Sequence, residues 1–517
     1  MIESRLARLS EPARKLAGLA ATVGREFSVD VVARAGEAAE DELVAALDEL
    51  WRRRIVRERG PDAYDFSHDR IREVAYFRMS PAERRRTHLR VAAALERLHA
   101  DDLDLVSGRL AAHYEHGGDA DAAIGWYRRA AAVAVALHAE ADAIGHLERA
   151  AALLRTQPAG DARDERELAL VMASLTPLAT AEGYGSPQLA QRQARGLELA
   201  AGLGVDPQPP LLRSAAVSAL AASDFDRARS FALRLRSGAE RSGDDVLLVE
   251  SDYVLGISAF WQGRLEAART HFEAAVDRYG PDRGATHLVH YGMDPKVVCL
   301  SRLGNSLWFL GHTVDAVDAR DAALRLAAEL DHPATGSTAR WFAIMLAVEL
   351  RDWESIRRYA ADLAGRADEL EVKPIQTNMR ALGGFLQVLD GNAGRGLARI
   401  RRSIDALKDE EHAPGHRSCI ARMLIEACRI AGDAPGGIAA AEVLLGDGAG
   451  APLWRAEALR MRAEFLASLG APADQVAAEL DEALVVARRQ GARALEARAA
   501  DTRGTLLERS RVHAHGP

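Results

Sequence analysis

The stretch that decides the fold reads Leu255-Gly256-Ile257-Ser258-Ala259-Phe260-Trp261-Gln262-Gly263-Arg264-Leu265-Glu266-Ala267-Ala268. An apolar run of helical length ends at a turn around Gly263, and a second helical pattern begins directly after it. Ala268 follows Gly263 by five residues, and Phe272 and Ala275 continue the apolar face at helical spacing. Because small side chains let two helices approach closely, the pattern predicts two helices packed across a tight turn.

The same phrase recurs along the chain. Trp308-Phe309-Leu310-Gly311 leads to Ala316 and Ala323 at the same offsets. Turn residues recur roughly every 40 residues, somewhat more than the 34 of a tetratricopeptide repeat, at Gly183, Asp224, Gly263, Gly311, Asp352, Gly391, Gly432 and Gly470. Each hairpin buries its apolar stripe by stacking on its neighbours. We therefore predict an all-α, tetratricopeptide-like right-handed solenoid over residues 99–512, followed by a disordered tail at 513–517. We also expect truncation near Gly446 to leave the preceding hairpins folded.

Composition limits the function classes. Acidic residues outnumber basic ones by 75 to 67, a net charge of −8, which argues against a general nucleic-acid-coating protein. Aromatic residues make up only 5% of the 517, and alanine dominates the apolar set, which favours packed helices over sheets.

Cysteine usage and the first residues bear on the compartment. Cys299, Cys419 and Cys428 show no C-x-x-C spacing, which is typical of buried free thiols in a reducing compartment. Glu3 and Arg5 do not fit a signal peptide, and no apolar run approaches the roughly 18 residues of a membrane span. We expect a cytoplasmic protein without membrane contact.

Motifs for catalysis and metal binding are missing. A P-loop needs Gly-Lys before Ser or Thr, and none of the four lysines follows a glycine. H-E-x-x-H and G-x-S-x-G are also absent. His113 with His116, and His287 with His290, share helix faces at i,i+3, but two histidines without a third ligand are a weak metal signal. We predict no enzyme activity, no catalytic residue, no metal and no cofactor bound by this chain itself.

Residues 1–98 follow a different pattern. Ser10-Glu11-Pro12 predicts the start of a helix, Ser28 that of a second, and residues 40–54 form a third. Two short extended runs, 55–58 and 64–67, flank a turn sequence. Three helices followed by a β-hairpin predict a winged-helix module, and a further helix from Asp69 leads outward towards the repeats.

Three stretches carry a resemblance. Tyr64-Asp65-Phe66-Ser67-His68-Asp69-Arg70-Ile71-Arg72-Glu73-Val74-Ala75-Tyr76, with Arg84-Arg85-Arg86-Thr87-His88, resembles the region just after the ATPase module of STAND-type signalling NTPases. These include large LuxR-type regulators and bacterial cyclase–ATPase–repeat fusions. The repeat arrays of the cyclase fusions are similar to two further stretches: Tyr291-Gly292-Met293-Asp294-Pro295-Lys296-Val297-Val298-Cys299-Leu300 with Leu307-Trp308-Phe309-Leu310-Gly311, and Ala487-Arg488-Arg489-Gln490-Gly491-Ala492 with Leu495-Glu496-Ala497-Arg498-Ala499-Ala500.

The resemblance implies a tripartite switch: an AAA-type ATPase, a winged helix that locks it, and a repeat array that senses a ligand or partner. This sequence contains no ATPase module, cyclase or LuxR-type DNA-binding domain. We therefore expect either part of a larger polypeptide or a stand-alone chain that works with a separate partner. ATP or ADP would act only through the missing NTPase domain, and the expected partners are that domain, another protein or a small-molecule inducer.

For His68 and for four tryptophans, a specific functional role and a simpler structural role both remain open. His68 occupies the place where the resemblance implies a histidine that contacts bound nucleotide and reports its state. The plainer interpretation is a residue that caps the outgoing helix, with Asp69 at the positive N-terminus. The tryptophans near hairpin turns could line a binding groove, but core filling is the favoured interpretation, for Trp261, Trp308, Trp341 and Trp353.

The overall hypothesis is a non-enzymatic sensor and protein-interaction arm of a STAND-type ATPase, cyclase or transcriptional regulator. The alternative is a DNA-binding transcriptional regulator that acts through residues 1–98. Arginines of this segment could contact phosphates, at Arg52, Arg53, Arg54, Arg57, Arg59, Arg84, Arg85 and Arg86. Acidic residues on the predicted third helix disfavour DNA, because they repel phosphate.

Overall fold

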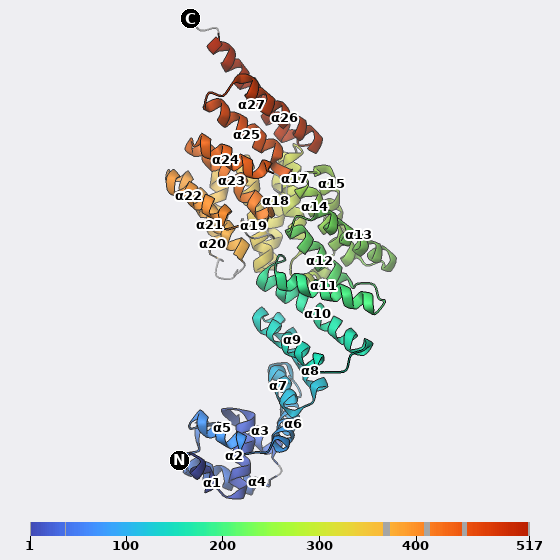
Figure 1. Ribbon diagram of the computed structural model, residues 1–517, viewed down its shortest axis with the longest axis vertical. Coiled ribbons are helices and arrows are strands. Elements are labelled where there is room, and N and C mark those ends of the chain that lie inside the picture. Colours follow the sequence, from blue (N-terminus) through green and yellow to red (C-terminus); the bar gives the residue numbers. More distant parts are fainter. Residues whose placement is uncertain are drawn as a thin grey trace. The chain divides into compact units, whose positions relative to one another are not determined.

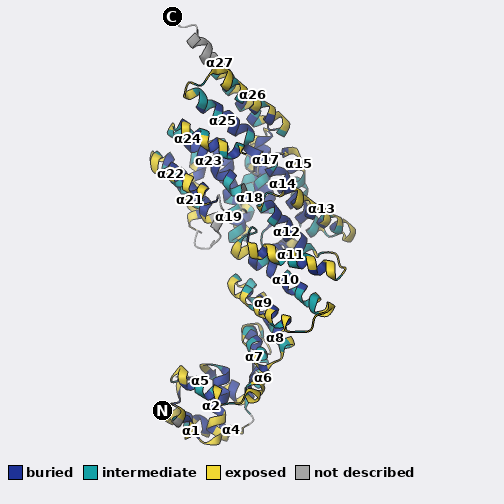
Figure 2. Cartoon of the chain, in the orientation of Figure 1, coloured by how far each residue is buried: buried dark blue, intermediate teal, exposed yellow. Residues whose placement is uncertain are grey.

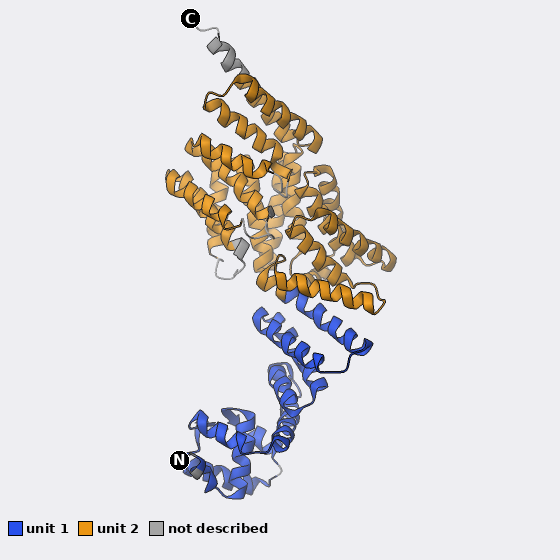
Figure 3. Ribbon diagram, viewed as in Figure 1, with its two compact units in different colours: residues 1–177 blue, residues 178–517 orange. Residues whose placement is uncertain are grey.

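The computed structural model describes residues 2–36, 38–60, 62–365, 373–407, 414–446 and 452–514. They form two compact units, residues 1–177 and 178–517 (Figure 3). Helices dominate both units, so the predicted all-α class is confirmed (Figure 1). The predicted boundary near residue 98 falls within the first unit and stays a prediction. Residues 513–517, predicted as a tail, lie at the end of the last helix and beyond the described residues.

The first unit begins with short helices around a small sheet. Its elements are α1 (Ile2–Ala7), α2 (Glu11–Val23), β1 (Glu26–Ser28), α3 (Val29–Ala35), α4 (Glu40–Arg52), β2 (Val56–Gly60) and β3 (Ala63–Phe66). The strands pair antiparallel in the order β1-β3-β2. Helix α2 begins as predicted, because the Ser10 hydroxyl accepts a hydrogen bond from the Ala13 amide at 3.3 Å.

The three predicted helices and the hairpin lie where the sequence predicts them, with the additional helix α1 and the additional strand β1. This strand has three residues, too few to show a period of two in the sequence. The core of this small sheet module packs against α2 and α3 and contains the side chains of Phe27, Leu50, Ile55 and Phe66. The designation as a winged helix stays a prediction.

Further helices complete the first unit, and the last of them continues past its end at Pro177. They are α5 (Asp69–Phe77), α6 (Pro81–Leu98), α7 (Ser107–Gly117), α8 (Ala120–Ala136), α9 (Glu140–Arg155) and α10 (Asp161–Glu182), with a 3-10 turn η1 (Asp104–Val106). Helix α6 packs on α2, α3 and α7, and so joins the small sheet module to the first helical hairpins of this unit.

The second unit is a series of helical hairpins. Its helices are α11 (Pro187–Gly202), α12 (Pro209–Ala221), α13 (Phe225–Ser242), α14 (Asp245–Trp261), α15 (Leu265–Arg278), α16 (Gly284–Tyr291), α17 (Pro295–Phe309), α18 (Thr313–Leu330), α19 (Pro333–Leu350), α20 (Trp353–Ala364), α21 (Lys373–Leu389), α22 (Ala393–Asp405), α23 (Pro414–Ala431), α24 (Ala434–Leu445), α25 (Arg455–Ser468), α26 (Ala473–Gln490) and α27 (Arg493–Ala514), with 3-10 turns η2 (Pro281–Arg283) and η4 (Pro452–Trp454). None of the described helices combines the length and apolar character of a membrane span.

The predicted register of the hairpins is confirmed around Gly263. This glycine has φ +69°, a left-handed conformation that glycine adopts without a Cβ penalty, and it ends α14. Ala268, Phe272 and Ala275 are fully buried, whereas Arg264 beside the turn is exposed. The small positions of the repeat therefore lie at the helix crossing.

The inner helices pack on one another in two runs, α12-α14-α17-α19 and α21-α23-α25-α27, and are buried on several sides (Figure 2). Trp261, Trp308 and Trp341 are buried among them, and the partly buried Trp353 contacts the Phe385 ring at a centroid distance of 5.9 Å. The interpretation of these tryptophans as core residues is confirmed. The three cysteines are buried and unpaired, as expected.

Hairpins that are distant in sequence also touch. Helix α27 packs on α17, and η4 packs on α14. The Trp454 ring lies 6.0 Å from the Trp261 ring, and the Arg498 guanidinium lies 4.7 Å from the centre of the Trp308 ring. One apolar core therefore runs from Leu212 to Ala499. The expectation that each hairpin contacts only its neighbours is wrong for this unit, because the last hairpins close back onto earlier ones.

Buried charges secure this closure. Glu349 on α19 accepts two hydrogen bonds from Arg422 at 2.9 Å each, one from the Trp454 indole at 3.0 Å and one from Arg498 at 3.0 Å. Arg498 also reaches Glu457 on α25 at 3.2 Å. Since these partners come from α23, η4 and α27, the carboxylate of Glu349 on α19 holds separate hairpins together.

Candidate functional site

His68 lies at the N-cap position of α5, where its side chain is exposed and makes no capping hydrogen bond. The interpretation of its imidazole as a helix cap is therefore wrong. Asp69 forms an ion pair with Arg25 at 3.1 Å instead. The role of His68 as a nucleotide sensor stays a prediction.

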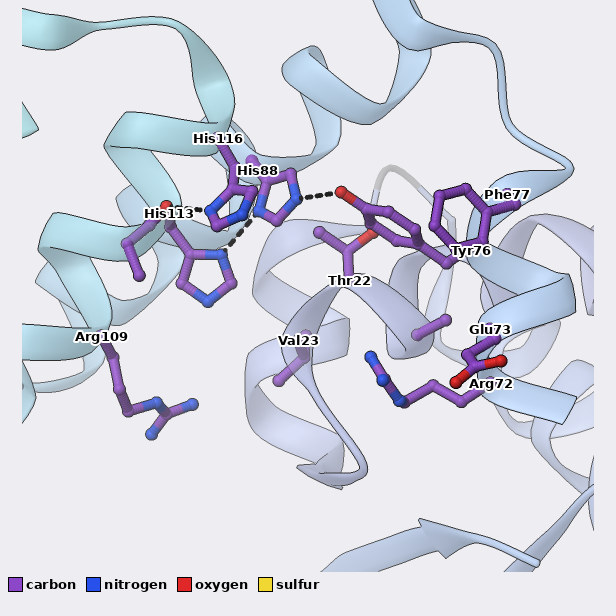
Figure 4. A pocket seen from close by; sticks show the side chains of 12 residues that line it. Thr22, Val23, Arg72, Glu73, Tyr76, Phe77, His88, Arg109, His113 and His116 are labelled. Carbon is purple, nitrogen blue, oxygen red and sulfur yellow. Dashed lines mark hydrogen bonds between the residues drawn. The ribbon is translucent and has the colours of Figure 1, made fainter. Parts of the chain in front are cut away.

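A different set of histidines comes together in the first unit (Figure 4). His88 lies on α6, and His113 and His116 lie one turn apart on α7. They line a cavity of about 420 Å³ whose other walls are the end of α2 and one face of α5, which contributes Arg72 and Tyr76. The cavity therefore forms where the outgoing helices α6 and α7 meet the small sheet module.

A chain of hydrogen bonds links these side chains. The Tyr76 hydroxyl lies 2.9 Å from Nε2 of His88, and Nδ1 of His88 lies 2.9 Å from Nδ1 of His113. The His116 ring stacks on His88 at a centroid distance of 4.9 Å, and its Nδ1 donates to the Ala112 carbonyl at 2.7 Å. Only one of these two facing Nδ1 atoms can carry a proton. The other Nδ1 atom accepts the hydrogen bond, so its ring must be a neutral imidazole.

Burial explains the charge state of this pair. It lowers the pKa of His88 to about 4, with smaller contributions from His116 and Arg84. Burial also lowers the pKa of His113 to about 3, assisted by His88 and Arg109. Both rings are thus neutral near pH 7. Among the described residues, no group of three His, Cys, Asp or Glu side chains is placed to hold a metal ion.

Two arginines give the cavity a positive rim. Nε of Arg72 is buried without a hydrogen-bond partner, and burial lowers the pKa of Arg109. Glu73 is engaged with Arg70 at 3.1 Å, and the Thr22 hydroxyl donates to the Gly18 carbonyl of its own helix at 3.0 Å. The cavity offers hydrogen-bonding rings and positive charge without an activated nucleophile, an arrangement suited to binding a polar or anionic group rather than to covalent catalysis.

Most of this site could not be predicted from the sequence. Tyr76, His88 and Arg72 stand within the stretch that carries the resemblance, but no local spacing connects them with α7. The only sequence signal is the i,i+3 pair of His113 and His116, which the structure places in the cavity together with His88.

No family model matches this chain. An uncharacterised protein of Rhizobium meliloti (strain 1021) is 25% identical over 521 residues, which cover 96% of this chain and 49% of that protein. The chain thus spans about half the length of the curated relative it matches.

Among solved structures, the chain is similar to a STAND protein with a tetratricopeptide repeat sensor from Pyrococcus horikoshii. The TM-score is 0.46 at 11% identity, with 84% of this chain and 62% of that one covered. The APC/C hetero-tetramer Cut9-Hcn1 is matched with a TM-score of 0.37 at 14% identity, over 84% of this chain and 85% of that one.

Proposed function

We propose that the chain is a non-enzymatic sensor and protein-interaction arm of a STAND-type signalling protein, and that its N-terminal module docks on a P-loop NTPase domain in cis or in trans. The sequence resemblance described above supports the class of partner. The surface of α4 carries the docking part of the proposal.

Helix α4 presents apolar side chains to solvent. Val44 and Trp51 are 55% and 53% exposed, and both lie on its outer face. Exposed acids surround them, at Glu40, Asp41 and Asp48. An exposed aromatic residue with a charged rim is typical of a protein-binding surface, and the acidic rim fits a basic partner.

The ion pairs of the arginines in this N-terminal module argue against the DNA-binding alternative. Arg57 and Arg59 lie on the buried carboxylate of Asp65, at 2.6 and 3.3 Å. Arg52 and Arg53 pair with acids on α4 itself. A phosphate backbone would have to displace these carboxylates, so these four arginines are poor phosphate contacts.

A photo-crosslinking amino acid at position 51 tests the docking, in the native organism and in the full protein. We expect a crosslink to a polypeptide segment that contains a P-loop. A crosslinker at Leu233, an exposed apolar residue of the second unit, serves as the control and should not capture that segment. Salt-dependent retention of the purified chain on random duplex DNA, together with no P-loop crosslink, would favour the DNA-binding alternative.

A further inference from the structure

An unpaired arginine lies deep among the inner helices of the second unit. The guanidinium of Arg302 on α17 lies 4.0 Å from the centre of the Phe342 ring on α19. Its Nε and Nη1 atoms are buried without a hydrogen-bond partner. No carboxylate of the described residues forms an ion pair with it. The residue as a whole is half-buried.

Other buried arginines of this unit differ in this respect. Arg213, Arg422 and Arg460 each meet a carboxylate, at 2.9, 2.9 and 2.8 Å. Burying a charge without a partner is costly, and proteins normally pair or remove such groups. An arginine stays protonated at neutral pH, so Arg302 keeps a positive charge that the described residues leave unmatched.

The groups around Arg302 are neutral. Burial raises the pKa of the Tyr253 hydroxyl and of the Cys299 thiol, and it raises the pKa of Cys419 to about 12. Burial, together with the charge of Arg302, lowers the pKa of His416 to about 4. No neighbouring hydroxyl, thiol or imidazole therefore supplies a negative charge at neutral pH.

A second polar group without a partner lies in the same region. The Asn378 side-chain amide donates to Nδ1 of His416 at 2.7 Å, which fixes the neutral ring as an acceptor. The Asn378 Oδ1 atom is buried and accepts no hydrogen bond, and only 4% of the residue is exposed. Buried polar atoms are normally satisfied, so the Arg302 nitrogens and the Asn378 Oδ1 atom keep hydrogen-bonding capacity that a ligand could use.

We propose that Arg302 is the anchor of a binding site for a small organic monocarboxylate, which completes the polar cluster formed with Asn378 and His416 on the inner helices α17, α19, α21 and α23. Only the biological role of this site rests on the proposed sensor function, because the bound carboxylate would be the signal that the repeat unit senses.

The chemistry of the site selects this ligand class. One guanidinium matches one carboxylate, with charge-assisted hydrogen bonds from its nitrogens. A phosphate dianion would need a second cation, and His416 is neutral. The Phe342 ring, whose centre lies 4.0 Å from the guanidinium, offers an apolar surface next to the charge, which favours an acid with an apolar body.

The test is a thermal-shift and calorimetric titration of the full chain with acetate, octanoate and benzoate. Benzamide is the neutral counterpart of benzoate, and inorganic phosphate is the anion control. We expect at least one monocarboxylate to raise the unfolding midpoint in a saturable way, and neither benzamide nor phosphate to do so. Arg302→Met should weaken that binding by about tenfold or more, because charge-assisted hydrogen bonds are lost. Arg234→Met, at an exposed position of α13, should bind like the wild type.

Two ligand-free measurements separate binding from a structural role. Arg302→Met should unfold at or above the wild-type midpoint, because it removes a buried unpaired charge. Asn378→Asp places a carboxylate in the cluster, so it should raise the midpoint without ligand and weaken monocarboxylate binding. No response to any of the three acids, an equal response to phosphate, or full binding by Arg302→Met would each overturn the proposal. None of these results depends on the crosslink at position 51, so the two proposals fail separately.

Discussion

Replacing Glu349 by glutamine tests whether the closure of the second unit stabilises it. The carboxylate is buried and accepts hydrogen bonds from Arg422, Arg498 and the Trp454 indole. Glutamine has the same shape but carries no charge, and its amide nitrogen cannot accept. The change removes the negative charge that Arg422 and Arg498 contact where α19, α23 and α27 meet.

The size of the effect follows from the burial. Removing one partner of a buried ion pair costs about 3–5 kcal/mol, because the remaining charge stays buried without compensation. Glu464→Gln is the matched control. Glu464 also pairs with an arginine, Arg460 at 3.0 Å, but its side chain is 40% exposed. Exposed pairs contribute about 0–1 kcal/mol, so this control should change the free energy of unfolding little.

Urea unfolding followed by circular dichroism and tryptophan fluorescence compares the two variants. Trp454 donates directly to Glu349 and is one of the seven tryptophans that give the fluorescence signal, so that signal includes a reporter of the closure, whereas the helical signal reports both units. We expect a lower urea midpoint for Glu349→Gln and a wild-type midpoint for Glu464→Gln. Equal midpoints would refute the reasoning and would mean that the apolar contacts alone hold the closure.

Three further predictions follow from the packing and from the histidine pair. Ala268→Trp should destabilise the unit by about 1–3 kcal/mol or more through overpacking at the helix crossing, whereas the exposed Arg264→Ala should stay within about 0.5 kcal/mol in thermal melts. Gly396→Ala should lower the melting temperature, because its Cβ would lie 2.5 Å from a backbone carbonyl oxygen of α21, whereas Gly394→Ala on the same helix meets nothing within 4 Å and should be neutral or stabilising. The free energy of unfolding should fall as pH drops from 6.5 towards about 4, because unfolded His88 takes up a proton that the buried ring refuses; His88→Gln should flatten that part of the pH profile, and an unchanged profile would contradict the assignment.

The local fold could be predicted from the sequence because it depends on short-range patterns. The turn glycine, the small residue five positions later and the apolar spacing place Gly263 and Ala268 correctly. Ser10 marks the start of α2 for the same reason, since capping is a contact over three residues.

Long-range contacts could not be predicted in this way. Glu349 and Arg498 are far apart in sequence, and neither stands in a distinctive motif, so the closure was missed. It also reverses the expectation for truncation near Gly446: the cut would remove Trp454 and α27, which pack on α14 and α17, and much of the helical signal should be lost. The cavity around His88 was missed for the same reason, because its residues converge from separate helices.

The closure of the last hairpins onto earlier ones also limits how such a protein can change over evolution. An open array tolerates the duplication or loss of a repeat, since each new unit finds an equivalent neighbour. Here an inserted hairpin between α19 and α25 would move Trp454 away from Trp261 and Arg498 away from Glu349. The number of hairpins between these contacts is therefore constrained, and homologous sequences should vary in length in loops or outside this segment rather than by whole repeats within it.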